Sequence, residues 1–320
     1  MIIVQILLLL AGLVLLVKGA DFFVDGSSSI AVKLKVPSLI IGLTIVAFGT
    51  SAPEAAVSII AGVKGQNDIA MGNVIGSNLF NLLAVIGICA AIRPINIEKA
   101  IIAREYPFSM LAVFVLIVLS GDLYLGEGNA NMLSRSDGII LLMFFGVFLY
   151  SVLSTALDSI KNSPPEENVQ PKFTIGKAVI FSILGLAGII GGGQLVVNSA
   201  TEIAYAFGIS EALVALTIVA VGTSLPELVT SVVAAKKGES DMAVGNVVGS
   251  NIFNVFFVLA SSSAIHPLNI SMENIIDLVI LIFVMLLVYV FCITQRKVSR
   301  VEGIILVLLY AAYMVYIVMR

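Results

Sequence analysis

Residues 43–54 of the chain read LTIVAFGTSAPE, and residues 216–227 read LTIVAVGTSLPE. A second matching pair follows: GNVIGSNLFN occupies 72–81 and GNVVGSNIFN occupies 245–254. The offset is 173 residues in both cases, and 24 of the 40 positions in 42–81 are identical to those in 215–254 without a gap. The chain therefore contains an internal repeat and consists of two related halves.

The sequence around both copies is strongly apolar. Of the 320 residues, 59% are hydrophobic and only 12% are charged, and the mean hydropathy is +1.12. A soluble domain carries about 25% charged residues. The apolar residues fall in runs of about 20, the length that a helix needs to cross a bilayer core of about 30 Å. This composition excludes a soluble enzyme and a disordered chain, and the net charge of −3 without a basic patch excludes a nucleic-acid binder.

The apolar runs predict an all-α integral membrane protein with ten transmembrane helices. A first five-helix half would occupy 1–157 with its motif at 43–81, a short linker 158–177, and a second half 178–320 with its motif at 216–254. The expected spans are 2–22, 36–63, 70–92, 106–119, 138–157, 178–198, 210–235, 243–265, 275–294 and 301–319.

Lysine and arginine residues predict the orientation of these spans. Most lie in the loops after spans one, three, five, seven and nine, whereas the opposite side holds only Lys64, Arg135 and Arg320. The positive-inside rule makes the first group cytoplasmic. We therefore expect a multi-pass protein of the cell membrane with both termini outside and the linker 158–177 in the cytoplasm.

An odd number of spans in each half has a consequence for the repeat. The second half must enter the membrane in the opposite orientation to the first, and inverted repeats of this kind build secondary transporters with the substrate site at the midplane. The alternative is a duplication without functional consequence.

Two acidic residues stand in the middle of predicted spans: Glu54 and Glu227. A charged side chain at the bilayer centre costs at least ~2.5–3.5 kcal/mol. No lysine or arginine lies at this depth in the sequence to pair with either residue. The remaining partners are a metal ion, sodium or a proton.

The neighbouring side chains favour a metal ion. Residues four apart share one face of a helix, and each glutamate has such a hydroxyl neighbour. Every candidate side chain offers oxygen and none offers sulfur or imidazole, and an all-oxygen shell suits Ca²⁺ or Na⁺. The candidates are Thr50, Ser51, Ser77 and Asn81 in the first copy and Thr223, Ser224, Ser250 and Asn254 in the second.

Glycine and proline beside each glutamate predict an irregular helix. Pro53 has no N–H to donate to the carbonyl of Gly49, and Pro226 and Gly222 repeat the arrangement. We expect both helices to bend there and to free carbonyls around Ala47 and Ala220 for an ion. An ordinary membrane-helix kink is the plainer interpretation.

Glycines four apart occur in both GNVxGSN motifs, at Gly72/Gly76 and Gly245/Gly249. This spacing predicts close helix packing, which would bring Ser77 and Asn81 against the helix that carries the glutamate. Four further asparagines are expected to bridge helices rather than to bind ions: Asn73, Asn78, Asn246 and Asn251.

GTSAPE and GTSLPE, each followed by GNVxGSNxFN, resemble the two α-repeats of the sodium/calcium exchanger family within the calcium/cation antiporter superfamily. The resemblance implies a ten-span fold and a central calcium site formed by Glu54, Glu227, Thr50, Thr223 and the carbonyls of Ala47 and Ala220. It also implies sodium sites formed by the same glutamates with Ser51, Ser224, Ser77 and Ser250, adjoined by Asn81 and Asn254.

The chain departs from relatives that carry an aspartate at one of the positions of Asn81 and Asn254. Potassium-dependent relatives use an acid there, so the two asparagines disfavour potassium co-transport. Cation/proton members usually show GNxxE in place of GTSxPE, which favours sodium as the coupling ion.

We therefore expect an antiporter that exchanges Na⁺ for Ca²⁺ by alternating access, is electrogenic and extrudes Ca²⁺. The two ions are its substrates, the bilayer is its surroundings, and we expect no enzyme activity, cofactor, nucleic acid or obligate protein partner. The alternatives are a Ca²⁺/H⁺ antiporter with the same site, a cation channel, and an intramembrane hydrolase, for which no catalytic motif is present. Cys89 and Cys292 are expected to be small buried hydrophobes.

Overall fold

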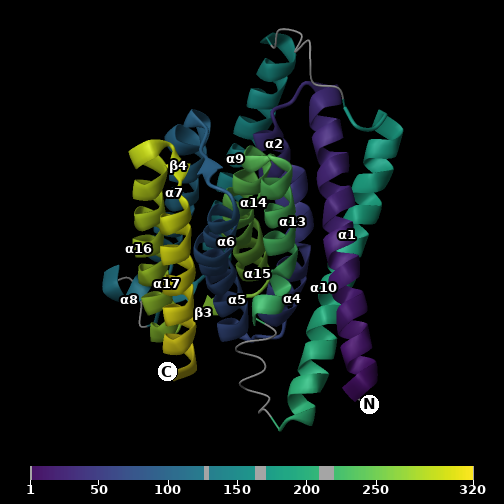
Figure 1. The fold of residues 1–320 in the computed structure, drawn as a ribbon. Helices are drawn as coiled ribbons and strands as arrows, with labels where there is room; N and C mark the ends of the chain where they lie inside the picture. Colours follow the sequence, from purple (N-terminus) through teal and green to yellow (C-terminus); the bar gives the residue numbers. More distant parts are fainter. Residues whose placement is uncertain (1, 126–129, 163–170, 209–219, 320) are drawn as a thin grey trace.

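A computed structural model describes residues 2–125, 130–162, 171–208 and 220–319. The described chain is helical apart from four strands of two residues each (Figure 1). Helices dominate because a backbone in lipid has no water to bond with and must satisfy its own N–H and C=O groups. The fold class expected from the sequence, an all-helical membrane protein, is confirmed.

Eight helices in the described part of the chain are long and apolar enough to cross a membrane. They are α1 (Ile2–Leu34), α5 to α6 (Asn67–Ile92), η3 to α7 (Ile101–Leu119), α9 (Arg135–Asn162), α10 (Ile175–Ala206), α14 to α15 (Ser240–Ile265), α16 (Met272–Gln295) and α17 (Arg300–Met319). Three of these contain π-helical turns: η2 (Asn81–Val85) between α5 and α6, η3 (Ile101–Glu105) before α7, and η5 (Asn254–Leu259) between α14 and α15.

A ninth candidate span is bent. It joins α2 (Ser38–Ile41), η1 (Gly42–Val46) and α3 (Ala47–Thr50) to α4 (Ala52–Val63), with a bend of 51° at Ser51. The remaining expected span, 210–235, lies partly outside the described residues. Its described part consists of α12 (Ala220–Thr223) and α13 (Leu225–Lys237), which are separated by Ser224.

Several helices extend beyond the spans expected from hydropathy. The first span was expected to end at 22, but α1 continues to Leu34, and α7 is preceded by a helical turn that begins at Ile101. Hydropathy ends a span at the first charged residues, whereas a helix continues into the polar region if its charged side chains find partners. Asp21 and Asp25 of α1 both have lysine partners, which explains the longer helix.

The middle of the bundle is formed by the helices of the repeated motifs. Every residue of α14 from Met242 to Phe253 is buried. A Cβ atom added at Gly245 would lie 2.7 Å from the carbonyl oxygen of Leu39, and one at Gly249 would lie 2.5 Å from that of Leu43. The close packing expected for this glycine pair is therefore confirmed, since α14 lies directly against the bent span. For Gly72 and Gly76 no described atom lies within 4 Å of an added Cβ.

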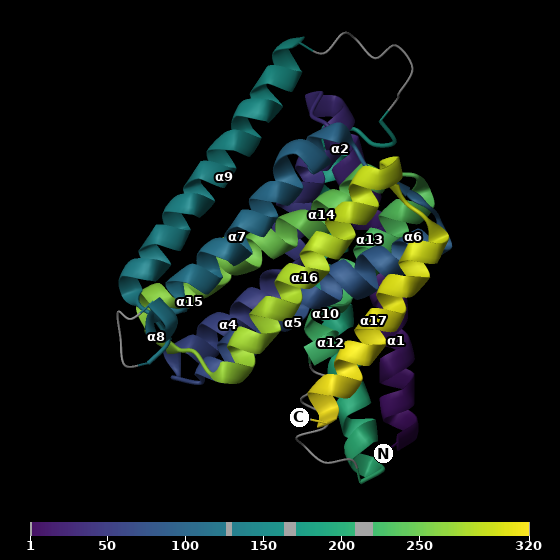
Figure 2. The same cartoon turned by 90° about the vertical axis from the view of Figure 1, so that its left-hand side faces the viewer.

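Helices α1 and α10 form a closely packed pair on one side of the bundle (Figures 1 and 2). Their backbones meet at glycine, because an added Cβ at Gly19 would lie 2.8 Å from the Gly185 oxygen, and one at Gly12 would lie 3.0 Å from the Gly192 oxygen. Glycine permits this approach because it has no side chain.

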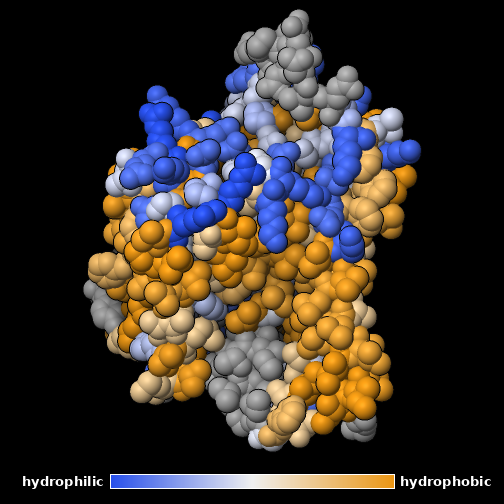
Figure 3. Space-filling view, viewed as in Figure 1, coloured by the Kyte–Doolittle hydropathy of each residue, from blue (hydrophilic) through white to orange (hydrophobic). Residues whose placement is uncertain are grey.

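Short strands connect the loops at the two ends of the bundle. β1 (Ile95–Asn96) pairs with β4 (Lys297–Val298), and β2 (Met132–Leu133) pairs with β3 (Leu268–Asn269), both antiparallel. Figure 1 shows the first residues of α1 and the last residues of α17 at the same end of the molecule. Hydrophilic residues form a band across the opposite end, above a continuous hydrophobic surface (Figure 3).

Candidate ion-binding site

Glu54 and Glu227 occupy equivalent places in the two halves. Each lies in the first turn of its helix, Glu54 in α4 and Glu227 in α13, directly after the helix break at Ser51 or Ser224. Proline is the second residue of each helix, where its missing N–H leaves no hydrogen bond unmade. Both glutamates are only 1% exposed, so the local sequence places two carboxylates inside the protein and away from lipid.

Serine hydroxyls connect the two glutamates crosswise. The Ser51 hydroxyl donates to Glu227 Oε1 at 2.8 Å, and the Ser224 hydroxyl donates to Glu54 Oε1 at 2.8 Å. The serine of each half therefore binds the carboxylate of the other half. This arrangement brings together four of the residues that the sequence predicted as ligands.

Four buried oxygens of the predicted ligands accept no hydrogen bond within the described part of the chain. They are Glu54 Oε2, Glu227 Oε2, Asn81 Oδ1 and Asn254 Oδ1. Neither glutamate forms an ion pair with a lysine or arginine of that part. A buried carboxylate without a countercharge is costly, and oxygen atoms are the ligands that hard cations select.

The asparagines and serines of the GNVxGSNxFN motifs form a hydrogen-bond network between the two halves. The Asn81 amide donates to Asn251 Oδ1 at 3.1 Å, and the Asn254 amide donates to Asn78 Oδ1 at 3.2 Å. The Asn254 amide also donates to the Ser77 hydroxyl at 3.0 Å. Because these bonds occupy the amide nitrogens, the amide oxygens of Asn81 and Asn254 are held in a fixed orientation with no donor attached.

Both asparagines begin a π-helical turn, Asn81 in η2 and Asn254 in η5. Such turns leave backbone groups out of the regular helical pattern and are frequent at functional sites. The sequence contains no proline or glycine at these two positions that would have predicted them.

The remaining predicted ligands are two threonines, two backbone carbonyls and Ser250. The Thr50 hydroxyl donates to Asn246 Oδ1 at 3.0 Å, and the Thr223 hydroxyl donates to Asn73 Oδ1 at 3.4 Å. The Ala47 carbonyl accepts the Ser51 N–H at 3.0 Å, so the bend does not free it as expected. The backbone is α-helical from Ala47 to Thr50, after the π-helical turn η1, and changes direction at Ser51. The Ser250 hydroxyl points to this same carbonyl, at 3.5 Å. Ala220 begins α12.

The bridging asparagines have a larger part than the sequence suggested. The Asn246 amide donates to the Glu227 carbonyl oxygen at 3.4 Å and to the Ser231 hydroxyl at 2.9 Å. Asn73 does the same with the Glu54 carbonyl and Ser58, at 3.3 and 2.8 Å. The expectation that these asparagines bridge helices is confirmed. Ser58 and Ser231 were not singled out from the sequence, although the repeat offset relates them.

The described fold and site define a class of protein: a helical membrane protein with a buried cluster of oxygen atoms supplied by two repeated motifs. The sequence model of the sodium/calcium exchanger protein family matches residues 4–154 and 177–319. The chain belongs to this family.

Individual relatives agree with this membership. The chain is 38% identical to the putative antiporter CaxA of Alkalimonas amylolytica, covering 97% of both sequences. It is 34% identical to the sodium/calcium exchanger MaX1 of Methanosarcina acetivorans, over 98% of this chain and 99% of that protein. Among solved structures, the sodium-calcium exchanger NCX_Mj soaked with Na⁺ and Sr²⁺ is similar with a TM-score of 0.84 and 33% identity, over 98% of this chain and 99% of that chain. The chain is thus a transporter of this family and not an enzyme.

Proposed function

We infer that this chain exchanges Na⁺ for Ca²⁺ across the cell membrane by alternating access and extrudes Ca²⁺. The observation that carries this proposal is the set of four buried, unpartnered oxygens on Glu54, Glu227, Asn81 and Asn254. Two carboxylates supply a charge of −2, which one Ca²⁺ neutralises. The names of MaX1 and NCX_Mj support the choice of sodium and calcium.

The proposed ligands are those that the family resemblance implies, and the crosswise serine–glutamate hydrogen bonds support the glutamates with Ser51 and Ser224. Ca²⁺ would be held by both glutamates with Thr50, Thr223 and the carbonyls of Ala47 and Ala220. Na⁺ would use the same glutamates with the hydroxyls of Ser51, Ser224, Ser77 and Ser250, adjoined by the amide oxygens of Asn81 and Asn254. Both ions are cargo, and no resident cofactor or obligate protein partner is proposed.

Antiport follows if Ca²⁺ and Na⁺ compete for these oxygens and the ion-free protein cannot switch from one side of the membrane to the other. An empty site would move two uncompensated carboxylates through a closed, dry state, which is costly. Binding of either Ca²⁺ or Na⁺ removes this cost. Only the ion-bound protein therefore switches the site from one side of the membrane to the other. Exchange of three Na⁺ for one Ca²⁺, the usual ratio of the family, would move one net charge and respond to voltage.

The proposed layout in the membrane is ten helices in two inverted halves, 1–157 and 178–320, joined by the linker 158–177. The first and last helices lie with their free ends at one end of the molecule, and the hydrophilic band lies at the other (Figures 1 and 3). By the positive-inside rule the hydrophilic end is cytoplasmic, which places both termini outside.

The test uses sodium-loaded proteoliposomes and radioactive calcium. Glu54→Gln or Glu227→Gln is expected to abolish calcium uptake, because each removes one of the two charges that balance the ion. Glu273→Gln changes an exposed glutamate in the first turn of α16 and serves as the control, with uptake expected near that of the unaltered protein. Near-normal uptake by both buried-site variants would refute the site.

A second arm separates sodium coupling from proton coupling. Unaltered protein is expected to accumulate calcium when a sodium gradient is imposed at equal pH. It is expected not to do so when only a pH gradient is imposed in sodium-free medium. The opposite pattern would establish the Ca²⁺/H⁺ antiporter that shares the same paired-glutamate site.

A further inference from the structure

The geometry points to an ion-pair latch that holds the cytoplasmic side of the transporter closed and biases it toward the outward-open state. The latch consists of Asp21, Asp25 and Ser28 on α1, Lys172 before α10, and Lys237 and Glu239 at the turn between α13 and α14. We call it the Lys237 latch. The inference rests on the proposed alternating access. It adds the contact that sets the equilibrium between the inward-open and outward-open states when no ion gradient is present.

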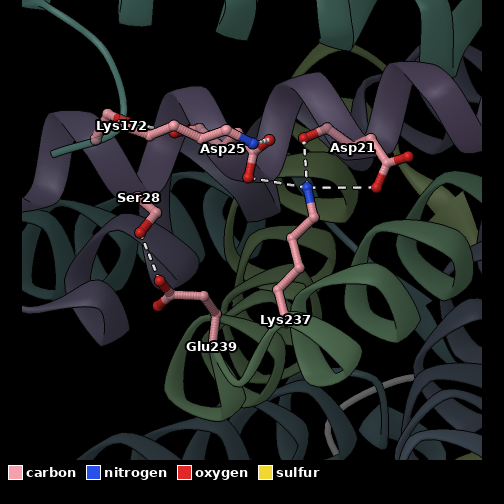
Figure 4. Close-up of polar contacts among 7 residues, drawn as sticks. Asp21, Asp25, Ser28, Lys172, Lys237 and Glu239 are labelled. Atoms are coloured by element: carbon pink, nitrogen blue, oxygen red, sulfur yellow. Dashed lines mark hydrogen bonds and ion pairs between the residues drawn. The ribbon is translucent and has the colours of Figure 1, made fainter.

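Lys237 is the centre of the latch (Figure 4). Its ammonium group lies 2.9 Å from Asp25 Oδ1 and 3.3 Å from Asp21 Oδ1, and it donates to the Asp21 carbonyl oxygen at 2.9 Å. Lys172 binds the other oxygen of Asp25 at 2.6 Å. The Ser28 hydroxyl donates to Glu239 Oε1 at 2.5 Å. All of these contacts join α1 either to the α13–α14 turn or to the segment before α10.

The latch connects α1 to the two helices that supply the second half of the candidate ion site. Lys237 is the last residue of α13, and Glu227 lies in the first turn of the same helix. Glu239 directly precedes α14, which contains Ser250 and ends just before Asn254. A displacement of α1 away from the turn would therefore open a path on the cytoplasmic side of these residues.

The contact is of a kind that can separate and re-form. A cavity of about 410 Å³ lies at the latch, lined by residues that include Val24, Ser29 and Val32 as well as the charged side chains. Polar side chains thus bridge a gap here, although the neighbouring Phe23 and Val24 of α1 belong to the buried apolar core. By contrast, α1 and α10 meet backbone to backbone at Gly19 and Gly185. The pair α1–α10 is the close-packed unit, and the latch is its separable contact with the bundle.

The internal repeat provides a comparison at the opposite end of the molecule. The offset of 173 residues relates Asp21 to Gln194, Asp25 to Asn198, Ser28 to Thr201, Lys237 to Lys64 and Glu239 to Gln66. Both aspartates and the glutamate are thus replaced by neutral residues.

The neutral set does not form a latch in the part of the chain that the structure describes. The Gln194 amide donates to Asn198 within α10 at 2.8 Å. Lys64 has no ion pair there. The two halves therefore differ in charge at equivalent positions, and among the described residues at these positions only those of the cytoplasmic end form ion pairs. This asymmetry favours the state in which the inner path is closed.

The expected size of the effect is moderate. The side chains of Lys237 and Asp25 are 28% and 17% exposed, so their pairing is only partly screened by solvent. Loss of a partly exposed ion-pair network of this size should raise the population with an open inner path roughly threefold to tenfold.

The test measures access to the cavity and does not depend on transport. Val24 lines the cavity and is 0% exposed. A Val24→Cys reporter is placed in a chain in which Cys89 and Cys292 are changed to alanine, and its reaction with a membrane-impermeant thiol reagent is followed from the cytoplasmic side without ion gradients. Lys237→Gln and Asp25→Asn are expected to raise the labelling rate roughly threefold to tenfold, whereas Lys237→Arg, which keeps the charge, leaves it nearly unchanged.

Lys64→Gln is the matched control, because it makes the same change at the repeat-related position, and it is expected to leave labelling unchanged. Raising ionic strength should increase labelling of the reporter chain more than that of its Lys237→Gln variant, since salt screens the pairing. Equal labelling rates in Lys237→Gln, Asp25→Asn and Lys64→Gln would overturn the latch. If labelling depends on Lys237 but no sodium-driven calcium uptake occurs, the proposed function fails and the latch stands.

Discussion

At the scale of single residues, Asn81 and Asn254 distinguish this chain from relatives that have an acid at one of these places. Both side chains have a donor nitrogen held by neighbours and a buried oxygen without a partner. The oxygen can face a cation at any pH, because an amide does not titrate in the physiological range. The site thus contains two titratable side chains, Glu54 and Glu227, among the ligands that we propose.

Changing Asn254 to aspartate tests this interpretation. Asn254→Asp adds a third carboxylate beside the two glutamates and removes the amide that binds Ser77 and Asn78. Calcium uptake is expected to persist, with an altered dependence on sodium concentration and on pH. The measurement is initial calcium uptake over a series of sodium concentrations and pH values, with Asn81→Asp as the repeat-related comparison. If the sodium and pH dependence of Asn254→Asp were unchanged, the Asn254 amide would have no role in the choice of coupling ion.

Much of the residue-level pattern was visible in the sequence because charge in an apolar span is exceptional. Glu54 and Glu227 stood out for that reason, and the structure places both inside the protein with Ser51 and Ser224 as partners. That these residues bind ions stays a prediction. The sequence predicted that Asn73 and Asn246 bridge helices, but it did not identify their partners Ser58 and Ser231, since which polar groups meet depends on how the helices pack.

At the scale of elements, glycine and proline control both the bend and the packing of the central helices. Gly49 and Pro53 predicted the bend, and the structure confirms it with an angle of 51°. Helix ends were predicted less well, because α1 continues through Asp21 and Asp25 where hydropathy alone would end it. The π-helical turns that begin at Asn81 and Asn254 have no signal in the composition.

The contact between α14 and the bent span depends on Gly249. A Cβ atom at this position would lie 2.5 Å from the Leu43 carbonyl oxygen, which belongs to the backbone and cannot move aside easily. Gly249→Ala is expected to destabilise the protein by about 1–3 kcal/mol through overpacking. The measurement is the midpoint of thermal unfolding in detergent, followed by the loss of the monodisperse elution peak.

Gly146→Ala is the control for this change. Gly146 is exposed on α9 and no described atom lies within 4 Å of an added Cβ. Alanine favours helix by up to ~1 kcal/mol over glycine at such a position. The thermal unfolding midpoint of Gly146→Ala is therefore expected to stay the same or to rise. A Gly249→Ala protein as stable as the control would mean that α14 can shift away from η1 at little cost.

At the scale of the whole molecule, the proposed exchange is unequal in charge. Three Na⁺ leaving for each Ca²⁺ entering would move one positive charge outward from a sodium-loaded vesicle. A membrane potential acts on that charge with about 2.3 kcal/mol per 100 mV. An inside-positive potential, set by external potassium and valinomycin, is therefore expected to accelerate calcium uptake.

The same potassium gradient without valinomycin is the control, because it changes the ions present without setting the potential. Initial calcium uptake is compared across the two conditions and at zero potential. An electroneutral exchange would give equal rates with and without valinomycin. Dependence on potassium itself, in the absence of valinomycin, would instead indicate that potassium is carried despite the two asparagines.

The crosswise pairing of Ser51 with Glu227 and of Ser224 with Glu54 has an evolutionary consequence. Each half supplies a carboxylate whose serine partner belongs to the other half, so neither half contains a complete pocket. If the two halves are inverted in the membrane, as we propose, an ancestral gene that encoded only one half would have needed a homodimer of two oppositely inserted copies to form this pocket. Fusion of the duplicated genes would then have fixed one copy in each orientation and freed the two to diverge, as the charged and neutral ends of α1 and α10 have done.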